Sequence, residues 1–250
     1  MYINFSIILP CFNESDNIHK LYNELINLKI QNIYFEVIFV NNGSTDDTGN
    51  KIDEVINISS NTNNLNFCIK KLNLDKNLGY GGGIIEGLKR ANGEYIGWTH
   101  ADLQTPLEDF YKLYNLAKNK KKIFAKGVRI NNRGFDSLVT KMHEMFARMI
   151  LGTNLSEINA QPKIIRKEDL SYFRNPPKDW TTIDTYFYFI SSKNNFQIIE
   201  LDVIFKQRIH GQSKWKNNFF IFIKHLFNNF IYLFKLKIIN EKNNTTKHNS

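Results

Sequence analysis

The sequence predicts an α/β protein built on a mostly parallel central sheet with helices on both faces. In the first half of the chain, short apolar runs alternate with longer amphipathic runs. Such alternation is typical of parallel strands joined by right-handed helical crossovers. The chain has 250 residues, enough for one substantial domain with a small appendage. Its content of 42% hydrophobic and 23% charged residues is ordinary for a soluble globular protein.

Four strands and four helices are expected in the first half, in alternation. The strand segments are short and apolar, whereas the helix segments carry apolar residues at helical spacing. Ser44 to Asp47 supply capping oxygens at one helix start, and Thr105-Pro106 ends a strand and opens another helix. The predicted strands are Ser6–Leu9, Glu36–Val40, Leu65–Ile69 and Tyr95–Trp98. The predicted helices are Asp16–Lys29, Thr45–Ile56, Gly82–Ala91 and Leu107–Ala117.

The second half is less regular. Apolar runs predict strands at Ile123–Val128 and Gln197–Phe205. Helical spacing predicts helices at Phe135–Leu151, around Phe187–Ser192, and over the aromatic-rich segment Asn217–Ile238. We therefore expect one domain over residues 1–215, an amphipathic helix over residues 216–240 and a disordered tail over residues 241–250.

Positive charge is concentrated near the C-terminal end. The formal net charge is +9, and residues 203–240 contain no Asp or Glu but seven Lys and Arg residues. This asymmetry indicates an anionic partner. No nucleic-acid recognition module is visible, so we expect no nucleic-acid partner.

The predicted C-terminal helix is amphipathic. Phe227, Phe230 and Phe234 share one face, while Lys224 and Lys235 lie on the other. The polar stripe makes a spanning helix costly and favours a helix at the surface of an anionic membrane. The alternative is packing against this domain or against a second subunit. Because no secretory signal is visible, we expect a cytoplasmic protein, peripheral on the inner face of the cell membrane.

Polar side chains follow the predicted strand Tyr95–Trp98 at the point where it ends. In an extended segment residues i and i+2 point to the same side, so His100 and Asp102 project together, with Gln104 in reach. In open α/β sheets, ligands bind at this carboxyl edge. These nitrogen and oxygen ligands could hold a divalent cation, and the cation a diphosphate. The alternative is a solvated turn.

Three other loops are expected at the same edge. Pro10 ends the first strand and places Phe12 and Glu14 there, where a ring can flank a base and a carboxylate can accept from a ribose. Asn42 offers a donor and an acceptor that suit a nucleobase edge. Gly79 opens a glycine-rich turn whose backbone can approach a ligand closely, although its spacing is neither a Walker loop nor a dinucleotide fingerprint. Each loop alone is also explained by an ordinary turn or helix cap.

Together, these loops resemble the nucleotide-sugar-binding half of family 2 glycosyltransferases, which have the GT-A fold. The matching segments are Ile8–Glu14, Glu36–Asp46, Asn77–Gly79 and Ala101–Gln104. A further segment, Phe205–Lys214, is similar to a region of dolichyl-phosphate mannose synthases and related polyprenyl-phosphate sugar transferases.

The resemblance implies an enzyme that transfers a hexose from a nucleotide-diphosphate sugar with inversion at the anomeric carbon. The acceptor would be a polyprenyl phosphate or a lipid-linked or cell-surface glycan. The nucleotide sugar would be bound by Pro10, Phe12, Glu14, Asn42, Gly79 and Asp102. Mg²⁺ or Mn²⁺ would be bound by Asp102, Gln104 and His100. Diphosphate or acceptor phosphate would be contacted by Arg129, Arg133, Lys163, Arg208 and Lys214.

Two features leave alternatives open. Asp184 resembles an acidic position of the family and is the candidate general base for a sugar-alcohol acceptor, a group that an ionised phosphate acceptor would not need. It is equally explained as a helix cap. The family usually has acidic residues where this chain has Asn41, Asn42 and His100. An imidazole at that last position favours Mn²⁺ over Mg²⁺. The alternative function is therefore a catalytically silent member that binds nucleotide sugar or membrane without turnover.

Overall fold

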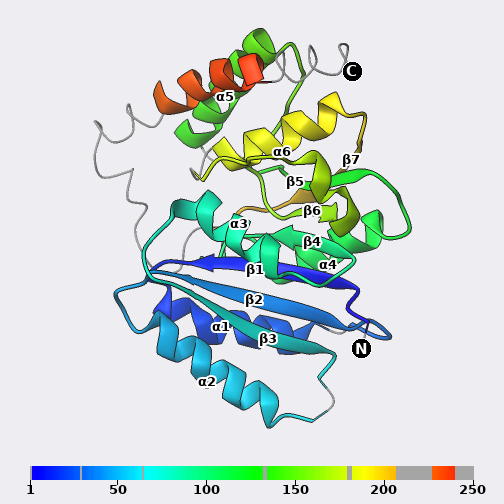
Figure 1. Cartoon of the computed structure of the whole chain (residues 1–250). Coiled ribbons are helices and arrows are strands. Elements are labelled where there is room, and N and C mark those ends of the chain that lie inside the picture. The colour runs from blue at the N-terminus through cyan, green and yellow to red at the C-terminus, as the bar shows by residue number, and fades with distance from the viewer. Residues whose placement is uncertain are drawn as a thin grey trace.

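In the described part of the chain, a seven-stranded sheet lies between two layers of helices (Figure 1). The computed structural model describes residues 2–28, 30–63, 65–131, 134–178, 182–206 and 227–239. The strands are β1 (Phe5–Cys11), β2 (Phe35–Asn42), β3 (Phe67–Leu74), β4 (Tyr95–Trp98), β5 (Ile123–Arg129), β6 (Lys163–Arg166) and β7 (Gln197–Val203). The helices are α1 (Ser15–Asn27), α2 (Thr48–Ser60), α3 (Gly79–Arg90), α4 (Leu107–Ala117), α5 (Phe135–Leu151) and α6 (Thr182–Lys193). A 3-10 helix spans Lys167–Tyr172, and a further helix spans residues 227–239.

The strand order is β3-β2-β1-β4-β6-β5-β7. β1 pairs in parallel with both β2 and β4, β2 pairs in parallel with β3, and β5 pairs in parallel with β7. Only β6 runs against its neighbours β4 and β5 in this described sheet. The carboxyl ends of β1, β2 and β4 therefore meet at one edge, as the alternating pattern predicts. The expected mostly parallel α/β architecture is confirmed.

Alternate strand residues face the two helical layers, as the pleat requires. Phe5, Ile7 and Leu9 of β1 belong to a core that also contains residues of α1, α2 and α4. Ile8, which lies between them, belongs to a second core formed with α3, α5 and α6. Because both faces are buried, the central strands are nearly continuous apolar runs.

The antiparallel strand β6 was not expected from the sequence. Its four residues, Lys163–Arg166, include two cations, so the segment does not match the pattern of a buried strand. The structure buries Lys163 completely by pairing it with a carboxylate. A buried cation thus takes a place that an apolar residue usually occupies.

The predicted C-terminal helix is present over residues 227–239, beside α5 (Figure 1). Leu233 and Leu236 are buried in the second core, and the Phe230 ring lies 5.3 Å from that of Phe146 in α5. One face of this helix therefore packs on the domain. Residues 207–226 and the predicted tail, 241–250, lie outside the described residues. Within the described segments, no helix has both the length and the apolarity needed to cross a bilayer.

Gly97, in the middle of β4, has no space for a side chain. A Cβ atom there would lie 2.1 Å from the carbonyl oxygen of Lys163 in β6 and 2.7 Å from the Phe110 ring. We expect Gly97→Ala to force β4 and β6 apart and to lower the free energy of unfolding by about 3 kcal/mol or more, measured by urea denaturation.

Gly49→Ala is the matched control. Gly49 lies in the first turn of α2, where a new Cβ would meet only the end of the Asn41 side chain, at 3.0 Å. Its free energy of unfolding should change by less than about 1 kcal/mol. Equal losses in the two variants would contradict this account of β4.

Candidate active site

The loops that follow β1 and β2 are joined by side-chain hydrogen bonds. The Asn13 backbone N–H donates to Ser44 Oγ at 3.2 Å, and the Thr45 N–H donates to Asn13 Oδ1 at 2.9 Å. The Glu14 N–H donates to Thr48 Oγ1 at 2.8 Å. These bonds hold the two loops as one unit at the sheet edge.

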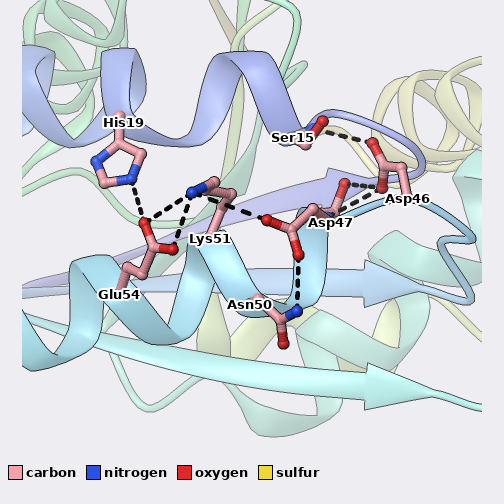
Figure 2. Close-up of polar contacts among 8 residues, drawn as sticks. Ser15, His19, Asp46, Asp47, Asn50, Lys51 and Glu54 are labelled. Atoms are coloured by element: carbon pink, nitrogen blue, oxygen red, sulfur yellow. Dashed lines mark hydrogen bonds and ion pairs between the residues drawn. The ribbon is translucent and has the colours of Figure 1, made fainter.

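Asp46 strengthens this junction by capping two helices (Figure 2). Its carboxylate accepts from the Ser15 N–H at 3.2 Å and from the Thr48 N–H at 3.0 Å. Burial opposes the ionisation of Asp46, but the hydrogen bonds from Thr48 and Ser15 outweigh it, so the pKa of Asp46 is lowered. The sequence predicts Asp46 only as a capping residue of one helix. In the structure it fixes the first turns of α1 and α2 together.

An exposed chain of charges continues between α1 and α2. His19 and Lys51 both contact the carboxylate of Glu54, and Lys51 also faces Asp47 (Figure 2). These side chains are partly exposed, so each pair contributes little to stability. The constraint on the loops therefore comes mainly from Asp46.

Pro10 lies in β1, which continues beyond the expected strand end to Cys11, and Phe12 and Glu14 follow in the joined loops; all three are half-buried. The Glu14 carboxylate accepts a 2.6 Å hydrogen bond from the Asn17 side chain. Pro10 faces α3, where a Cβ on Gly83 would lie 3.1 Å from its ring. The sequence-predicted nucleoside contacts are thus brought to one edge.

Asn42 holds the glycine-rich turn in place. Its Nδ2 donates to the Gly79 carbonyl at 2.9 Å, and its Oδ1 accepts from the Leu78 N–H at 2.9 Å. Both ends of this buried amide therefore bind backbone, which no apolar or charged residue of that size would reproduce. The predicted contact with a nucleobase stays a prediction, whereas the positioning of the turn is directly described.

The glycine-rich turn also meets the segment before α6. The Gly82 N–H donates to the Lys178 carbonyl at 2.9 Å, and a Cβ on Gly79 would lie 3.2 Å from that same carbonyl oxygen. Gly79 has a φ of +76°, a backbone conformation that favours glycine. The first turn of α3 is thus fixed on two sides, by Asn42 and by Lys178.

Asp102 lies in a sharply bent loop after β4. Its side chain is 3% exposed, and its Oδ1 accepts from the Gln104 N–H at 3.1 Å. Between them, Leu103 adopts a φ of +62°, which is rare for a bulky residue. Such strain is often stored where a side chain must be presented to a ligand.

Gln104 is hydrogen-bonded to the segment that follows β7. Its Nε2 donates to the Lys206 carbonyl at 3.0 Å, and the Lys206 N–H donates to the Gln104 carbonyl at 2.8 Å. The chain is therefore held beside the Asp102 loop two residues before Arg208. Arg208, Lys214 and Arg133 themselves lie outside the described residues.

His100 stacks against Tyr80. The two ring centroids are 4.9 Å apart and the planes differ by 29°. Tyr80 comes from the first turn of α3, so this contact joins the glycine-rich turn to the loop that carries Asp102. Sequence reasoning did not single out Tyr80, although its place beside Gly79 in the turn was the available signal.

Asp184 is buried in α6 and accepts three hydrogen bonds. Its Oδ1 lies 3.1 Å from both the Trp98 Nε1 and the Lys163 Nζ, and its Oδ2 accepts from the Gln161 Nε2 at 3.0 Å. Asp184 is 2% exposed and Lys163 is fully buried. Burial lowers the pKa of Lys163 to about 8, against the charge of Asp184, which raises it.

Two further cations lie close to this pair. Lys126 is fully buried and faces Glu200 at 3.2 Å; burial lowers its pKa, although Glu200 opposes the change. Arg129 pairs with Glu157, while its Nη2 is buried without a hydrogen-bond partner among the described residues. Of the predicted phosphate ligands, Lys163 is therefore engaged with Asp184, and Arg129 retains an unused donor.

No three His, Cys, Asp or Glu side chains within the described ranges gather into a ready-made metal site. Asp102 and His100 do come to the same loop, and Gln104 follows them. The structure thus brings together the predicted loops, and the metal, phosphate and base roles stay predictions.

Comparison with known proteins decides the family. The family model for glycosyl transferase family 2 matches residues 6–189, about three quarters of the chain. The chain belongs to glycosyl transferase family 2. The match begins in β1 and ends in α6, so it includes the joined loops, Asp102 and Asp184.

Curated relatives of this family 2 chain include lipid-phosphate sugar transferases. It is 27% identical over 232 residues to a dolichol-phosphate mannosyltransferase of Pyrococcus furiosus, covering 89% of this chain and 62% of that protein. It is 23% identical to an undecaprenyl-phosphate 4-deoxy-4-formamido-L-arabinose transferase of Proteus mirabilis, covering 84% and 62%. The chain thus spans less than two thirds of these relatives.

Solved structures confirm the fold. A mannosyltransferase of Pyrobaculum calidifontis in complex with GDP-Man and Mn²⁺ superposes with a TM-score of 0.63, at 14% identity, over 85% of this chain and 59% of that one. A glucosyl-3-phosphoglycerate synthase of Mycobacterium tuberculosis in complex with Mn²⁺ and UDP gives 0.60, at 18% identity, over 86% and 74%. The GT-A architecture expected from the sequence is confirmed.

The Lys163–Asp184 pair predicts a specific pattern of stability changes. We expect Lys163→Met to lower the free energy of unfolding by about 3–5 kcal/mol, because it leaves a buried carboxylate without its cation. The double variant Lys163→Met/Asp184→Asn should regain part of that loss, since the buried charge is then gone as well. Urea denaturation of the wild type and of the single and double variants measures both. A double variant no more stable than Lys163→Met would contradict the pairing.

Proposed function

We propose that this chain transfers a hexose, with inversion, from a nucleotide-diphosphate sugar to a polyprenyl phosphate at the cytoplasmic face of a membrane. The observation that carries the proposal is the placement of Asp102. Its buried carboxylate follows β4 at the edge where the loops after β1 and β2 are joined by hydrogen bonds. A lipid-linked or cell-surface glycan is the second candidate acceptor.

The donor site is built by the joined loops. Phe12 and Glu14 lie where a ring can flank a nucleobase and a carboxylate can accept from a ribose, with Pro10 behind them. The structural neighbours named above are complexes with GDP-Man or UDP, which supports a nucleotide donor for this chain. Asn42 holds the neighbouring glycine-rich turn through both ends of its amide, and in this proposal it lies near the base.

A divalent cation fits the Asp102 loop by its chemistry. Asp102 provides a buried carboxylate, and His100 and Gln104 provide nitrogen and oxygen ligands in the same loop. The hydroxyls of Thr99 and Thr105, which flank the loop, are buried without a hydrogen-bond partner among the described residues. A bound Mn²⁺ or Mg²⁺ would stabilise the negative charge of the leaving diphosphate. Both metals occur in complexes of the structural neighbours.

Basic side chains complete the diphosphate site in this proposal. The Gln104 clamp on Lys206 brings the chain to the Asp102 loop just before Arg208, and Lys214 follows six residues later. Cations aimed at the place where charge develops lower the barrier to departure of the leaving group. Attack by the acceptor oxygen on the face opposite the diphosphate gives inversion in a single displacement.

The environment of Asp184 favours a phosphate acceptor over a glycan. Three donors hold its carboxylate, including the Lys163 ammonium, so it is poorly placed to accept a further proton from a sugar alcohol. An ionised phosphate needs no base. The Arg129 Nη2 group, which has no hydrogen-bond partner among the described residues although Arg129 pairs with Glu157, is a donor that a phosphate oxygen could take up. The names of the curated relatives support the same acceptor class.

The membrane is contacted, in this proposal, through α5 and the helix of residues 227–239. We call their exposed apolar side chains the apolar face: Leu138, Met142, Met145, Met149, Phe227, Ile231, Phe234 and Ile238. Met149 and Phe227 are 71% and 62% exposed. The exposed cations Lys141, Arg148 and Lys235 lie on the same two helices, so an anionic bilayer surface is the occupant that complements them.

The Asp102 side chain supplies the main test of transfer. We expect Asp102→Ala to reduce hexose transfer from a Mn²⁺-bound nucleotide sugar by at least about 10²-fold, because it removes a group that stabilises the leaving diphosphate. The assay measures radiolabelled sugar transferred to undecaprenyl phosphate from UDP-glucose or GDP-mannose. Asp53→Asn, at an exposed position on α2, is the control and should keep full activity.

The catalytically silent alternative gives a different result in the same assay. Such a protein would bind a nucleotide sugar, but neither transfer nor hydrolysis would exceed the rate of the Asp102→Ala variant. That outcome would reject the proposed transfer.

The apolar face predicts the response of membrane binding to added charge. We expect Met149→Glu/Phe234→Glu to weaken binding to vesicles of phosphatidylglycerol and phosphatidylcholine at least about tenfold, since two apolar side chains no longer enter the bilayer surface. Co-sedimentation measures the bound fraction. Ile58→Glu, at a similarly exposed apolar position on α2, is the matched control and should bind as the wild type does. Equal binding of all three proteins would reject the membrane surface.

A further inference from the structure

Tyr80 carries a buried hydroxyl that has no hydrogen-bond partner among the described residues. The side chain lies in the first turn of α3, directly after Gly79. Buried polar groups in folded proteins are nearly always paired, because an unpaired group loses its bonds to water. An unpaired buried hydroxyl in the first turn of α3 therefore requires an explanation.

The Tyr80 side chain is held firmly in place. Its ring stacks on His100 with centroids 4.9 Å apart, and its turn is fixed on one side by Asn42 and on the other by the Lys178 carbonyl. These contacts leave the ring little freedom to swing towards another partner. The hydroxyl thus lacks a partner because of the fold itself, since His100, Asn42 and Lys178 fix the ring and its turn from three separate segments.

Two carboxylates act on the Tyr80 hydroxyl. Burial raises the pKa of Tyr80 well above its usual value, and the negative charges of Asp184 and Asp102 raise it further. A tyrosine hydroxyl carries one hydrogen that it can donate, so this group is available as a donor to a ligand. The ring contacts His100, which precedes Asp102 in the same loop, and the turn that carries Tyr80 is hydrogen-bonded to Lys178, in the segment before α6 and Asp184.

A second orphan tyrosine shows what is special about this position. Tyr22 of α1 is also buried with an unpaired hydroxyl, but it belongs to the apolar core beneath the other face of the sheet. An unpaired hydroxyl alone therefore does not mark a site. Tyr80 also packs against an apolar core, the second one, but it differs from Tyr22 because its ring stacks on His100 in the loop that carries Asp102.

We propose that the Tyr80 hydroxyl donates a hydrogen bond to a hydroxyl oxygen of the hexose in the bound nucleotide sugar, and so helps to select that hexose. The inference rests on the proposed function, in which the diphosphate lies by Asp102 and the acceptor by the buried Asp184 pair. The hexose is the group that passes between them. Tyr80 is held against His100 beside the Asp102 loop, on a turn that meets the segment before α6, so its hydroxyl is placed to contact the sugar. The bound sugar gives the unpaired hydroxyl its partner.

The test compares nucleotide sugars with the same nucleotides lacking the sugar. Isothermal titration calorimetry in the presence of Mn²⁺ measures the dissociation constants of UDP, UDP-glucose, GDP and GDP-mannose for the wild type, Tyr80→Phe and Tyr22→Phe. For the nucleotide that the wild type binds, we expect Tyr80→Phe to weaken the nucleotide sugar about 3–10-fold, the worth of one hydrogen bond, and to leave the nucleoside diphosphate unchanged. Tyr22→Phe, which removes an equally buried orphan hydroxyl, should change neither constant.

The ratio of the two dissociation constants decides the outcome. An unchanged ratio in Tyr80→Phe, whether both ligands keep their affinity or both weaken equally, would overturn the role of Tyr80 in sugar binding. A wild type that binds none of the four ligands with Mn²⁺ would instead overturn the proposed function and this inference with it. Thermal unfolding of both variants, expected to match the wild type, confirms that the fold is retained.

Discussion

The buried contact between Asp184 and Lys163 holds the second half of the sheet against the first. It joins α6 to β6, and the Trp98 indole adds β4 to the same carboxylate. Burying two charges is expensive, and their attraction offsets that cost only when geometry and additional hydrogen bonds are favourable. Here Gln161 supplies a further donor to Asp184, and the Ala160 carbonyl accepts from Lys163. The position of the β4 end, and of the loop that follows it, depends on this arrangement.

The edge at which these groups lie combines a rigid scaffold with strained loops. β1 and β2 end side by side, and the bonds around Asn13, Asp46 and Thr48 fix the turns beyond them. The Asp102 loop departs from β4 with Leu103 in a left-handed conformation. Loops held by a buried sheet are the usual place for binding groups, because the scaffold positions them without being altered by the ligand. The family 2 assignment fits this arrangement, since the matched region spans all of these loops.

The parallel half of the fold was predictable because its signal is local. Each strand and helix from Ser6 to Ala117 shows its own periodicity, and Tyr95–Trp98 and Leu107–Ala117 are observed with the predicted bounds. The antiparallel strand β6 was not predictable, because the burial of Lys163 depends on Asp184, which lies twenty-one residues later in the chain. Pairings between distant side chains leave no periodic pattern in a sequence.

The candidate site likewise contains residues that the sequence predicts and contacts that only the structure shows. Asp102, Phe12 and Glu14 could be proposed from the sequence because they follow predicted strands, and strand ends of a parallel sheet converge. The amide clamp of Asn42, the stacking of Tyr80 on His100 and the saturation of Asp184 by three donors required coordinates. They depend on where α3 and α6 pack, which the sequence alone does not determine. Arg133, Arg208 and Lys214 stay predictions.

The central claim is that the edge beside Asp102 binds a metal together with a nucleotide diphosphate. Crystals soaked with Mn²⁺ and either UDP or GDP test it most directly, through anomalous difference maps recorded at the manganese edge. The account predicts an anomalous peak within coordination distance of the Asp102 carboxylate and of the nucleotide diphosphate, with the base against the loop of Phe12 and Glu14. A nucleotide bound elsewhere on the molecule, or at this edge without manganese beside Asp102, would contradict it.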